Sequence, residues 1–224
     1  MKKSWILAIL LLAFVFYASA WADYYPNEKP VWGLTQDTAY LLDPGQWYLD
    51  VWGWATYGMA SNFQMGSNFW LDMAQLVNVY TKLRLVEEGA GNPAISLGAS
   101  YYTTLVGMGS LWDATLYLTK TLETDNRWFY ASAKYLNAAA TATSSSGSVH
   151  LVGGNGLNVT LGLINQNAPH WRSFLELAYD SSSSTSATRG GGGFEWAFGL
   201  WRYRLGGYIS QTFFTLILDL GWRF

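Results

Sequence analysis

A set of charged and aromatic residues has the side-chain chemistry to hold a small solute in a confined space. Aromatic rings offer flat apolar contact, and charged groups orient the polar end of a molecule passing between them. The set consists of Asp50, Trp52, Trp54, Tyr80, Lys82, Arg84, Lys134, Arg172, Glu176, Arg202 and Arg204. Its members Lys82, Arg84, Arg202 and Arg204 favour an anionic end. The alternative is that opposite charges in the set pair with one another, because an unpaired buried charge is costly.

The histidines give little support for catalysis. His150 stands beside a serine-rich stretch, and His170 is followed by Ser173, which falls on the opposite parity. A serine nucleophile needs a base within hydrogen-bond reach. Glu176 shares the parity of His170, but along a strand it would lie about 20 Å away at roughly 3.3 Å per residue. We therefore expect no enzymatic activity.

Metal ions, cofactors and nucleic acids are also not expected as ligands. The chain has no cysteine, so no disulfide framework or thiolate metal site is available. The two histidines lack neighbouring carboxylates, which disfavours a zinc site. The formal net charge is −2 and no basic cluster occurs, so a nucleic-acid partner is not indicated.

The composition combines many aromatic residues with few charges. Aromatic residues make up 17% of the chain, including 13 Trp, whereas charged residues make up 12%. The charged share is about half the usual one. Mean hydropathy is +0.07, which is too polar for a bundle of membrane helices. A β-barrel in a membrane explains both shares, since half of its strand residues face lipid and aromatic girdles mark two interfaces.

Apolar residues alternate with polar ones over most of the chain, which predicts β-strands. The predicted strands cover residues 32–42, 46–57, 62–71, 75–87, 95–105, 112–119, 128–139, 155–165, 170–180, 194–198, 202–209 and 215–224. Charged residues fall on the face opposite the apolar one, among them Asp113, Glu195, Asp219 and Arg223 besides the charged members of the set above. A charge facing lipid costs roughly 2–4 kcal/mol at midplane, so this segregation favours a barrel over a soluble β-sandwich.

The N-terminus has the pattern of an export signal. Lys2 and Lys3 precede an apolar run from Ile6 to Tyr17, and Ala18-Ser19-Ala20 matches a cleavage site. The apolar run is too short to span the roughly 30 Å of hydrocarbon as a helix. We expect cleavage after Ala20, a periplasmic lead-in over residues 21–30, and a barrel over residues 31–224.

The last strand carries a family resemblance. Leu216, Leu218, Leu220, Trp222 and Phe224 alternate with mostly polar residues and end the chain on an aromatic ring. This resembles the terminal strand of bacterial outer-membrane β-barrel proteins of porin-like or transporter-like type. The resemblance implies a Gram-negative outer membrane, lipid as surroundings, and reading of Leu220, Trp222 and Phe224 by the barrel-assembly machinery. The Asn78, Lys82 and Arg84 spacing is similar to a pattern in uncharacterised families of such barrels.

The expected fold is an all-β, transmembrane, antiparallel up-and-down barrel of twelve strands, with ten as the alternative. Twelve strands place turns at 58–60, 88–93, 122–126, 166–169 and 199–200 on the periplasmic side and serine-rich loops at 141–148 and 181–193 outside. Lipid-facing Trp47 and Trp112 then lie near the outer interface, and Trp128, Trp171 and Trp222 near the inner one.

The expected function is narrow passive passage of a small solute, because twelve strands lie between filled eight-stranded barrels and open sixteen-stranded porins. A structural or adhesive barrel that uses the two serine-rich loops is the alternative. A lipid-modifying outer-membrane enzyme is a minor alternative.

Overall fold

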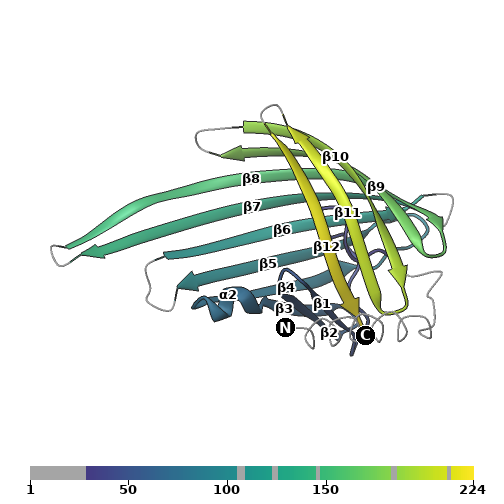
Figure 1. Cartoon of the computed structure of the whole chain (residues 1–224), viewed down its shortest axis with the longest axis horizontal. Coiled ribbons are helices and arrows are strands. Elements are labelled where there is room, and N and C mark those ends of the chain that lie inside the picture. Colours follow the sequence, from purple (N-terminus) through teal and green to yellow (C-terminus); the bar gives the residue numbers. More distant parts are fainter. Residues whose placement is uncertain (1–28, 105–108, 123–125, 145–146, 183–185, 211–212) are drawn as a thin grey trace, which may run out of the picture.

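The computed structural model describes residues 29–104, 109–122, 126–144, 147–182, 186–210 and 213–224. The predicted signal peptide, residues 1–20, and most of the predicted lead-in, residues 21–30, lie outside this description. The chain forms a single curved sheet whose strands follow one another in sequence order (Figure 1).

The predicted fold class is confirmed as an all-β, antiparallel, closed up-and-down barrel of twelve strands. Each strand pairs with its neighbours in sequence, and β1 pairs with β12 to close the sheet. The strands are β1 (Trp47–Asp50), β2 (Trp54–Ala60), β3 (Phe63–Asn68), β4 (Leu76–Val86), β5 (Ala94–Thr104), β6 (Gly109–Thr121), β7 (Arg127–Ser144), β8 (Gly147–Ala168), β9 (Trp171–Ser182), β10 (Ser186–Phe198), β11 (Trp201–Ser210) and β12 (Phe214–Arg223).

The closing seam joins the last strand to the first. Leu49 pairs with Trp222, and the Phe224 main chain exchanges hydrogen bonds with Trp47 at 2.6 and 3.0 Å. Full closure leaves no unpaired sheet edge between these strands, which a barrel in lipid requires.

The count of twelve is right, but two of the predicted strands are wrong. Residues 32–42 form no barrel strand, only an isolated bridge between Trp32 and Asp37. The predicted strand 46–57 is instead two strands, β1 and β2, separated by a turn at residues 51–53. Gly53 has φ +91°, a left-handed conformation that glycine adopts at little cost. The two errors cancel in the count.

The barrel has two ends that we name by the chain terminus. The terminus end carries Phe224, the connections at 61–62, 87–93, 169–170 and 199–200, and the end of β6 with the start of β7. The far end carries the connections at 51–53 and 69–75. The predicted turns at 58–60 and 166–169 come later in the chain than expected, because β2 continues to Ala60 and β8 to Ala168. The turns predicted to share one end do so. The Asp43-Pro44-Gly45 turn also lies at the terminus end, where Gly45 N–H donates to Gly58 C=O at 2.8 Å.

The two serine-rich stretches were wrongly predicted as long loops wherever the structure describes them; residues 145–146 and 183–185 lie outside the described residues. Residues 141–144 continue β7 and residues 147–148 begin β8, so the two strands form a long hairpin that extends beyond its neighbours in Figure 1. Residues 181–182 end β9, and 186–193 belong to β10, whose glycines pair with β9 and β11. Serine, threonine and glycine here satisfy the strand ladder, so low complexity alone does not mark a loop.

The predicted segregation of faces is confirmed along the strands. Polar and charged side chains of the inward face are buried, including Lys82, Asp113, Glu176, Glu195 and Arg204. Large apolar side chains on the outer face are exposed, such as Val77, Leu97, Leu116, Leu175 and Leu218.

Aromatic side chains gather at both ends of the outer face. At the terminus end, Trp201 lies 4.6 Å from Trp222 and Trp47 lies 4.6 Å from Tyr57, measured between ring centroids. Nearer the far end, Trp112 lies 5.6 Å from Tyr135.

Two of the predicted girdle positions were wrong. Trp47 sits at the terminus end because the strand that carries it starts there. Trp128 points inward, is 5% exposed, and lies under the guanidinium of Arg172 at 5.6 Å.

The helical content is small. Helix α2 (Phe69–Met73) follows β3, and the Asn68 side chain caps it by accepting a hydrogen bond from the Leu71 N–H at 3.2 Å. In the described part of the chain, no helix is long and apolar enough to cross a membrane.

Candidate functional site

Residues 30–42 run through the interior of the barrel instead of joining its wall, and we call them the luminal segment. Val31, Leu34 and the run 38–42 are buried, so the segment contributes a core that the strands surround. Leu34, Ala39 and Tyr40 pack with inward aromatic side chains of the wall such as Tyr130 and Phe174. The lumen is therefore partly filled by the chain itself.

A carboxylate on β9 anchors the middle of the luminal segment. Glu176 is 2% exposed and accepts a hydrogen bond from the Thr35 main-chain N–H at 3.2 Å. It also accepts hydrogen bonds from the hydroxyls of Thr35, Tyr130 and Tyr208. Tyr130 holds the segment a second time, because its hydroxyl accepts from the Leu34 N–H at 3.3 Å. The buried charge is thus satisfied by converging donors.

Two glycines let the tyrosines reach Glu176. Tyr130, Gly162, Glu176, Gly191 and Tyr208 occupy successive strands β7 to β11 in one cross-strand row. A Cβ at Gly162 would lie 2.1 Å from the Tyr130 ring, and one at Gly191 would lie 2.6 Å from the Tyr208 ring. Each ring therefore lies over a glycine, which explains two of the glycines in this wall.

The glycines opposite the luminal segment have a similar role. A Cβ at Gly193 or Gly206 would lie 2.9 or 2.7 Å from a methyl carbon of Leu34. The paired glycines of β10 and β11 thus form a shallow wall against which the segment packs. This part of the glycine-rich stretch makes room for the segment.

Lys82 fixes the segment from the other side of the barrel. Its side chain is 0% exposed, and its ammonium donates to Tyr40 C=O at 2.7 Å and lies 3.4 Å from the Asp37 carboxylate. The Tyr80 hydroxyl donates to the same carboxylate. The ammonium also lies 5.0 Å from the Tyr117 ring centroid. This buried lysine is fully engaged by the segment and its neighbours.

Side chains of the wall take the place of a strand ladder for the segment's main chain. Ala39 N–H donates to the Thr119 hydroxyl at 2.7 Å, and the Ser96 hydroxyl donates to Ala39 C=O at 2.6 Å. Leu42 N–H donates to the Gln64 side chain at 2.9 Å. These bonds explain why the inward positions carry hydroxyls and amides where the segment passes.

Glu88, in the connection between β4 and β5, holds the segment at the terminus end. Its carboxylate accepts from the Tyr40 hydroxyl at 2.7 Å and the Thr121 N–H at 2.5 Å, and it pairs with Lys29 at 3.2 Å. Burial alone would raise the pKa of Glu88, but the hydrogen bonds from Tyr40, Thr121 and Lys29 outweigh it and lower the pKa to about 2.

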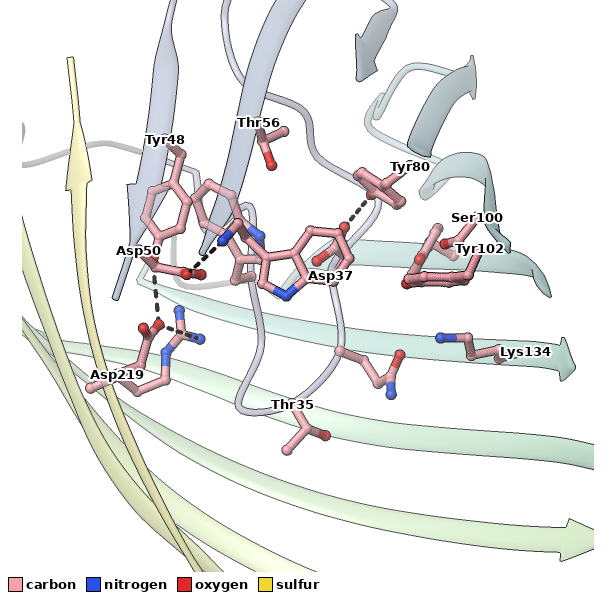
Figure 2. A pocket seen from close by; sticks show the side chains of 15 residues that line it. Thr35, Asp37, Tyr48, Asp50, Thr56, Tyr80, Ser100, Tyr102, Lys134 and Asp219 are labelled. Carbon is pink, nitrogen blue, oxygen red and sulfur yellow. Dashed lines mark hydrogen bonds and ion pairs between the residues drawn. The ribbon is translucent and has the colours of Figure 1, made fainter. Parts of the chain in front are cut away.

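A polar cavity of about 260 Å³ lies between the luminal segment and the wall. Figure 2 shows Asp50 and Asp219 on one side, Ser100, Tyr102 and Lys134 on the other, and Asp37 between them. Its lining residues are Trp32, Thr35, Gln36, Asp37, Tyr48, Asp50, Trp54, Thr56, Tyr80, Ser100, Tyr102, Tyr117, Lys134, Arg204 and Asp219. The cavity is the candidate site.

The two basic groups of the cavity have acidic partners. Lys134 pairs with Asp113 at 3.3 Å. Arg204 pairs with Glu195 at 2.9 Å and lies 3.7 Å from Asp219. Asp50 differs, because its carboxylate accepts from the Trp54 N–H at 2.9 Å and, within the described part of the chain, no lysine or arginine lies at ion-pair distance from it.

The structure brings part of the predicted solute-contact set together. Asp50, Trp54, Tyr80, Lys134 and Arg204 line the cavity. The rest of the set lies elsewhere: Lys82 beneath the luminal segment, Glu176 at its anchor, Arg172 beside Glu195 at 3.6 Å, Trp52 59% exposed in the β1–β2 turn, and Arg84 and Arg202 bonded to main-chain carbonyls of terminus-end turns.

Sequence reasoning did not select Trp32, Asp37, Tyr48 and Asp219 as site residues. Tyr48 and Asp219 were on the inward parity, which was the available signal. Trp32 and Asp37 belong to the luminal segment, which the twelve-strand prediction assigned to the wall as strand 32–42.

Of the histidines considered for catalysis, His170 lies in the connection between β8 and β9, where its ring centroid is 6.5 Å from that of Phe198. Its main-chain carbonyl accepts from the Ala197 N–H at 2.8 Å. The side chain of His150 lies outside the described part of the structure.

Comparisons with known proteins found no matching family model and no matching curated protein. Among solved structures, a porin is similar at 9% identity with a TM-score of 0.42, over 76% of this chain and 60% of the porin. The outer membrane channel DcaP of Acinetobacter baumannii is similar at 10% identity with a TM-score of 0.42, over 90% of this chain and 68% of the channel. The chain thus spans less than two thirds of the porin's length. The barrel assignment rests on the strand pairing described above.

Proposed function

We propose that this protein is a bacterial outer-membrane barrel that lets small solutes pass through a narrow lumen, with the luminal segment as its constriction. The exposed apolar outer face supports lipid as the surroundings, because soluble proteins rarely expose apolar patches larger than a few hundred Å². Strands β4 to β12 have the length needed to cross a bilayer, about 9–11 residues.

The observation that carries the proposal is the polar cavity between the luminal segment and the wall. A barrel with a purely structural role needs only paired inward charges, as seen at Lys134 with Asp113. The cavity instead leaves polar and aromatic groups facing about 260 Å³ of space. The luminal segment is held to the wall by apolar packing and by hydrogen bonds and ion pairs, and the polar contacts that face the cavity can exchange with water as a solute moves past.

The test is electrophysiology of the purified full-length protein in planar bilayers, together with solute uptake by vesicles. We expect small single-channel conductance. Trp32→Ala, which trims the segment where it lines the cavity, should increase conductance and uptake. Leu218→Ala on the exposed outer face is the matched control and should leave both unchanged. Absence of conductance and of uptake with both the unmodified protein and Trp32→Ala would contradict the proposal.

We also propose that Leu220, Trp222 and Phe224 are read by the barrel-assembly machinery. Phe224 is 54% exposed. Its two hydrogen bonds to Trp47 of β1 are made by main-chain atoms. Phe224→Ala keeps those bonds and removes the ring. We expect slower insertion in cells and unchanged stability of the folded barrel, measured by heat-modifiable gel migration. Normal insertion of this variant would argue against the signal.

A further inference from the structure

We propose that the polar cavity binds a small organic cation, a molecule with an amine or quaternary ammonium group, next to Asp50. The inference rests on the proposed function for the route by which the solute reaches the cavity, and it names the class of solute. It reverses the preference for an anionic end that the inward bases suggest in the sequence.

Asp50 supplies the counter-charge. Asp50 is 9% exposed, lines the cavity, and among the described residues has no ion-pair partner. A carboxylate withdrawn this far from water is costly unless a cation compensates it. The charge of Arg204 acts on Asp50, but from beyond ion-pair distance, and Arg204 is itself paired with Glu195 at 2.9 Å. The hydrogen bond from the Trp54 N–H engages one of its two oxygens, Oδ1, at 2.9 Å, and a carboxylate can accept several more.

Asp219 adds a second acceptor beside it. One carboxylate oxygen of Asp219 accepts from the Tyr48 hydroxyl at 3.2 Å and faces Arg204 at 3.7 Å. The other oxygen is buried without a hydrogen-bond partner. Both carboxylates lie on the same side of the cavity (Figure 2). An ammonium group placed between them would compensate the charge of Asp50 and reduce its repulsion with Asp219.

Aromatic rings supply the rest of a cation site. Trp32 and Tyr48 lie with ring centroids 4.1 Å apart, and Trp54 meets Tyr80 edge-on at 6.5 Å. All four line the cavity. Rings of this kind attract ammonium groups through their negative faces, and quaternary ammonium ligands are recognised by aromatic cages.

The same cavity is unsuited to an anion. Its two bases are already neutralised, Lys134 by Asp113 and Arg204 by Glu195. A bound carboxylate or phosphate would have to displace one of these acids while lying near Asp50. The volume, about 260 Å³, is below the 300–1,000 Å³ range of sites for drug-sized ligands, so the expected solute is small.

The experiment is equilibrium binding to the full-length protein in detergent, followed by calorimetry and tryptophan fluorescence. The probe is choline, and its neutral isostere 3,3-dimethylbutan-1-ol and propionate are the comparison ligands. We expect choline to bind at least about tenfold more tightly than either. Equal affinity for choline and its isostere, or tighter binding of propionate, would overturn the proposal without requiring any variant.

Two variants locate the site. Asp50→Asn should weaken choline binding at least about tenfold, and Trp54→Leu should weaken it by a smaller factor. Asp43→Asn, which removes a carboxylate that is 75% exposed at the terminus end, is the matched control and should bind choline as the unmodified protein does. Heat-modifiable migration verifies that each variant is folded. Unchanged affinity in folded Asp50→Asn would refute the site.

Binding and passage give separate answers. Choline binding without conductance would support the cation site and contradict the proposed channel. Conductance without choline binding would support the channel and contradict the cation site.

Discussion

Glu176 and Asp50 are both buried carboxylates on the inward face of the barrel, yet their surroundings differ. Glu176 receives hydrogen bonds from Tyr130, Tyr208 and the luminal segment. Asp50 receives one from the Trp54 N–H and faces a cavity. The difference is whether the luminal segment reaches the carboxylate. The inward-facing charged residues therefore have different roles. Glu176 holds the luminal segment, whereas Asp50 is available to bind a ligand.

This contrast gives a rule for assigning the inward charges. A charge whose partners belong to the luminal segment, such as Lys82 with Tyr40, stabilises the fold. Asp50 has no such partner. Removing a fold-stabilising charge should cost stability, whereas removing Asp50 should cost binding. The predictions below test this separation, beginning with the largest expected change in the free energy of unfolding.

Glu176→Gln should lower the free energy of unfolding by about 3 kcal/mol, because hydrogen bonds to charged groups each contribute about 1.5–3 kcal/mol. The amide also places N–H donors against hydroxyls that already donate. Denaturant unfolding in lipid vesicles, followed by tryptophan fluorescence, measures the change. Glu87→Gln, which neutralises a carboxylate that is 77% exposed in a turn, should change little. If Glu176→Gln and Glu87→Gln lowered the free energy of unfolding equally, Glu176 would not be a residue that stabilises the fold through the luminal segment.

Gly162→Ala should lower the free energy of unfolding by about 2 kcal/mol, within the range for overpacked sites. The added methyl would lie 2.1 Å from the Tyr130 ring and force it away from Glu176. Gly154→Ala is the control on the same strand, because a Cβ there meets no atom within 4 Å. If both variants are equally stable, the cross-strand row does not hold the segment.

Glu88 should make stability fall in acid. Its folded pKa of about 2 is below the ordinary value of 4.5, so its stabilising contribution is present above pH 4.5 and is lost as the pH falls towards 2. Glu88→Gln should flatten this part of the profile of unfolding free energy against pH. A profile identical to that of the unmodified protein would mean that Glu88 does not hold the segment through its charge.

Asp50→Asn should change the free energy of unfolding by less than about 1 kcal/mol, since the asparagine oxygen can still accept from the Trp54 N–H. The same unfolding measurement applies, with Glu176→Gln as the comparison. A loss as large as that of Glu176→Gln would place Asp50 among the residues that hold the fold.

The sequence predicted the wall well because a strand's two faces are readable residue by residue. Leu83 and Leu85 alternate with Lys82 and Arg84, and the structure keeps this order. The predicted strand 46–57 was wrong because a glycine within a strand pattern is also compatible with a turn. The two halves are distinguished only by their partners, since β1 pairs with β12 and β2 pairs with β3.

The luminal segment could not be predicted from local pattern. Its partners are far away in sequence, as Thr35 is from Glu176 and Lys82 is from Asp37. Inward parity identified Asp50 and Arg204 as neighbours of the lumen, but not which of them has a charge partner. That depends on contacts between strands and segment that no single stretch encodes.

The luminal segment supports the shortest strands of the wall. Strands β1, β2 and β3 have 4, 7 and 6 residues, so they offer few ladder bonds of their own. The segment lies inside a sheet that closes between β1 and β12. Val31 and Leu42 of the segment pack with Tyr48 of β1, and the Leu42 N–H donates to the Gln64 side chain of β3 at 2.9 Å. The shortest strands of the wall therefore gain contacts from inside the barrel that their own ladders do not supply.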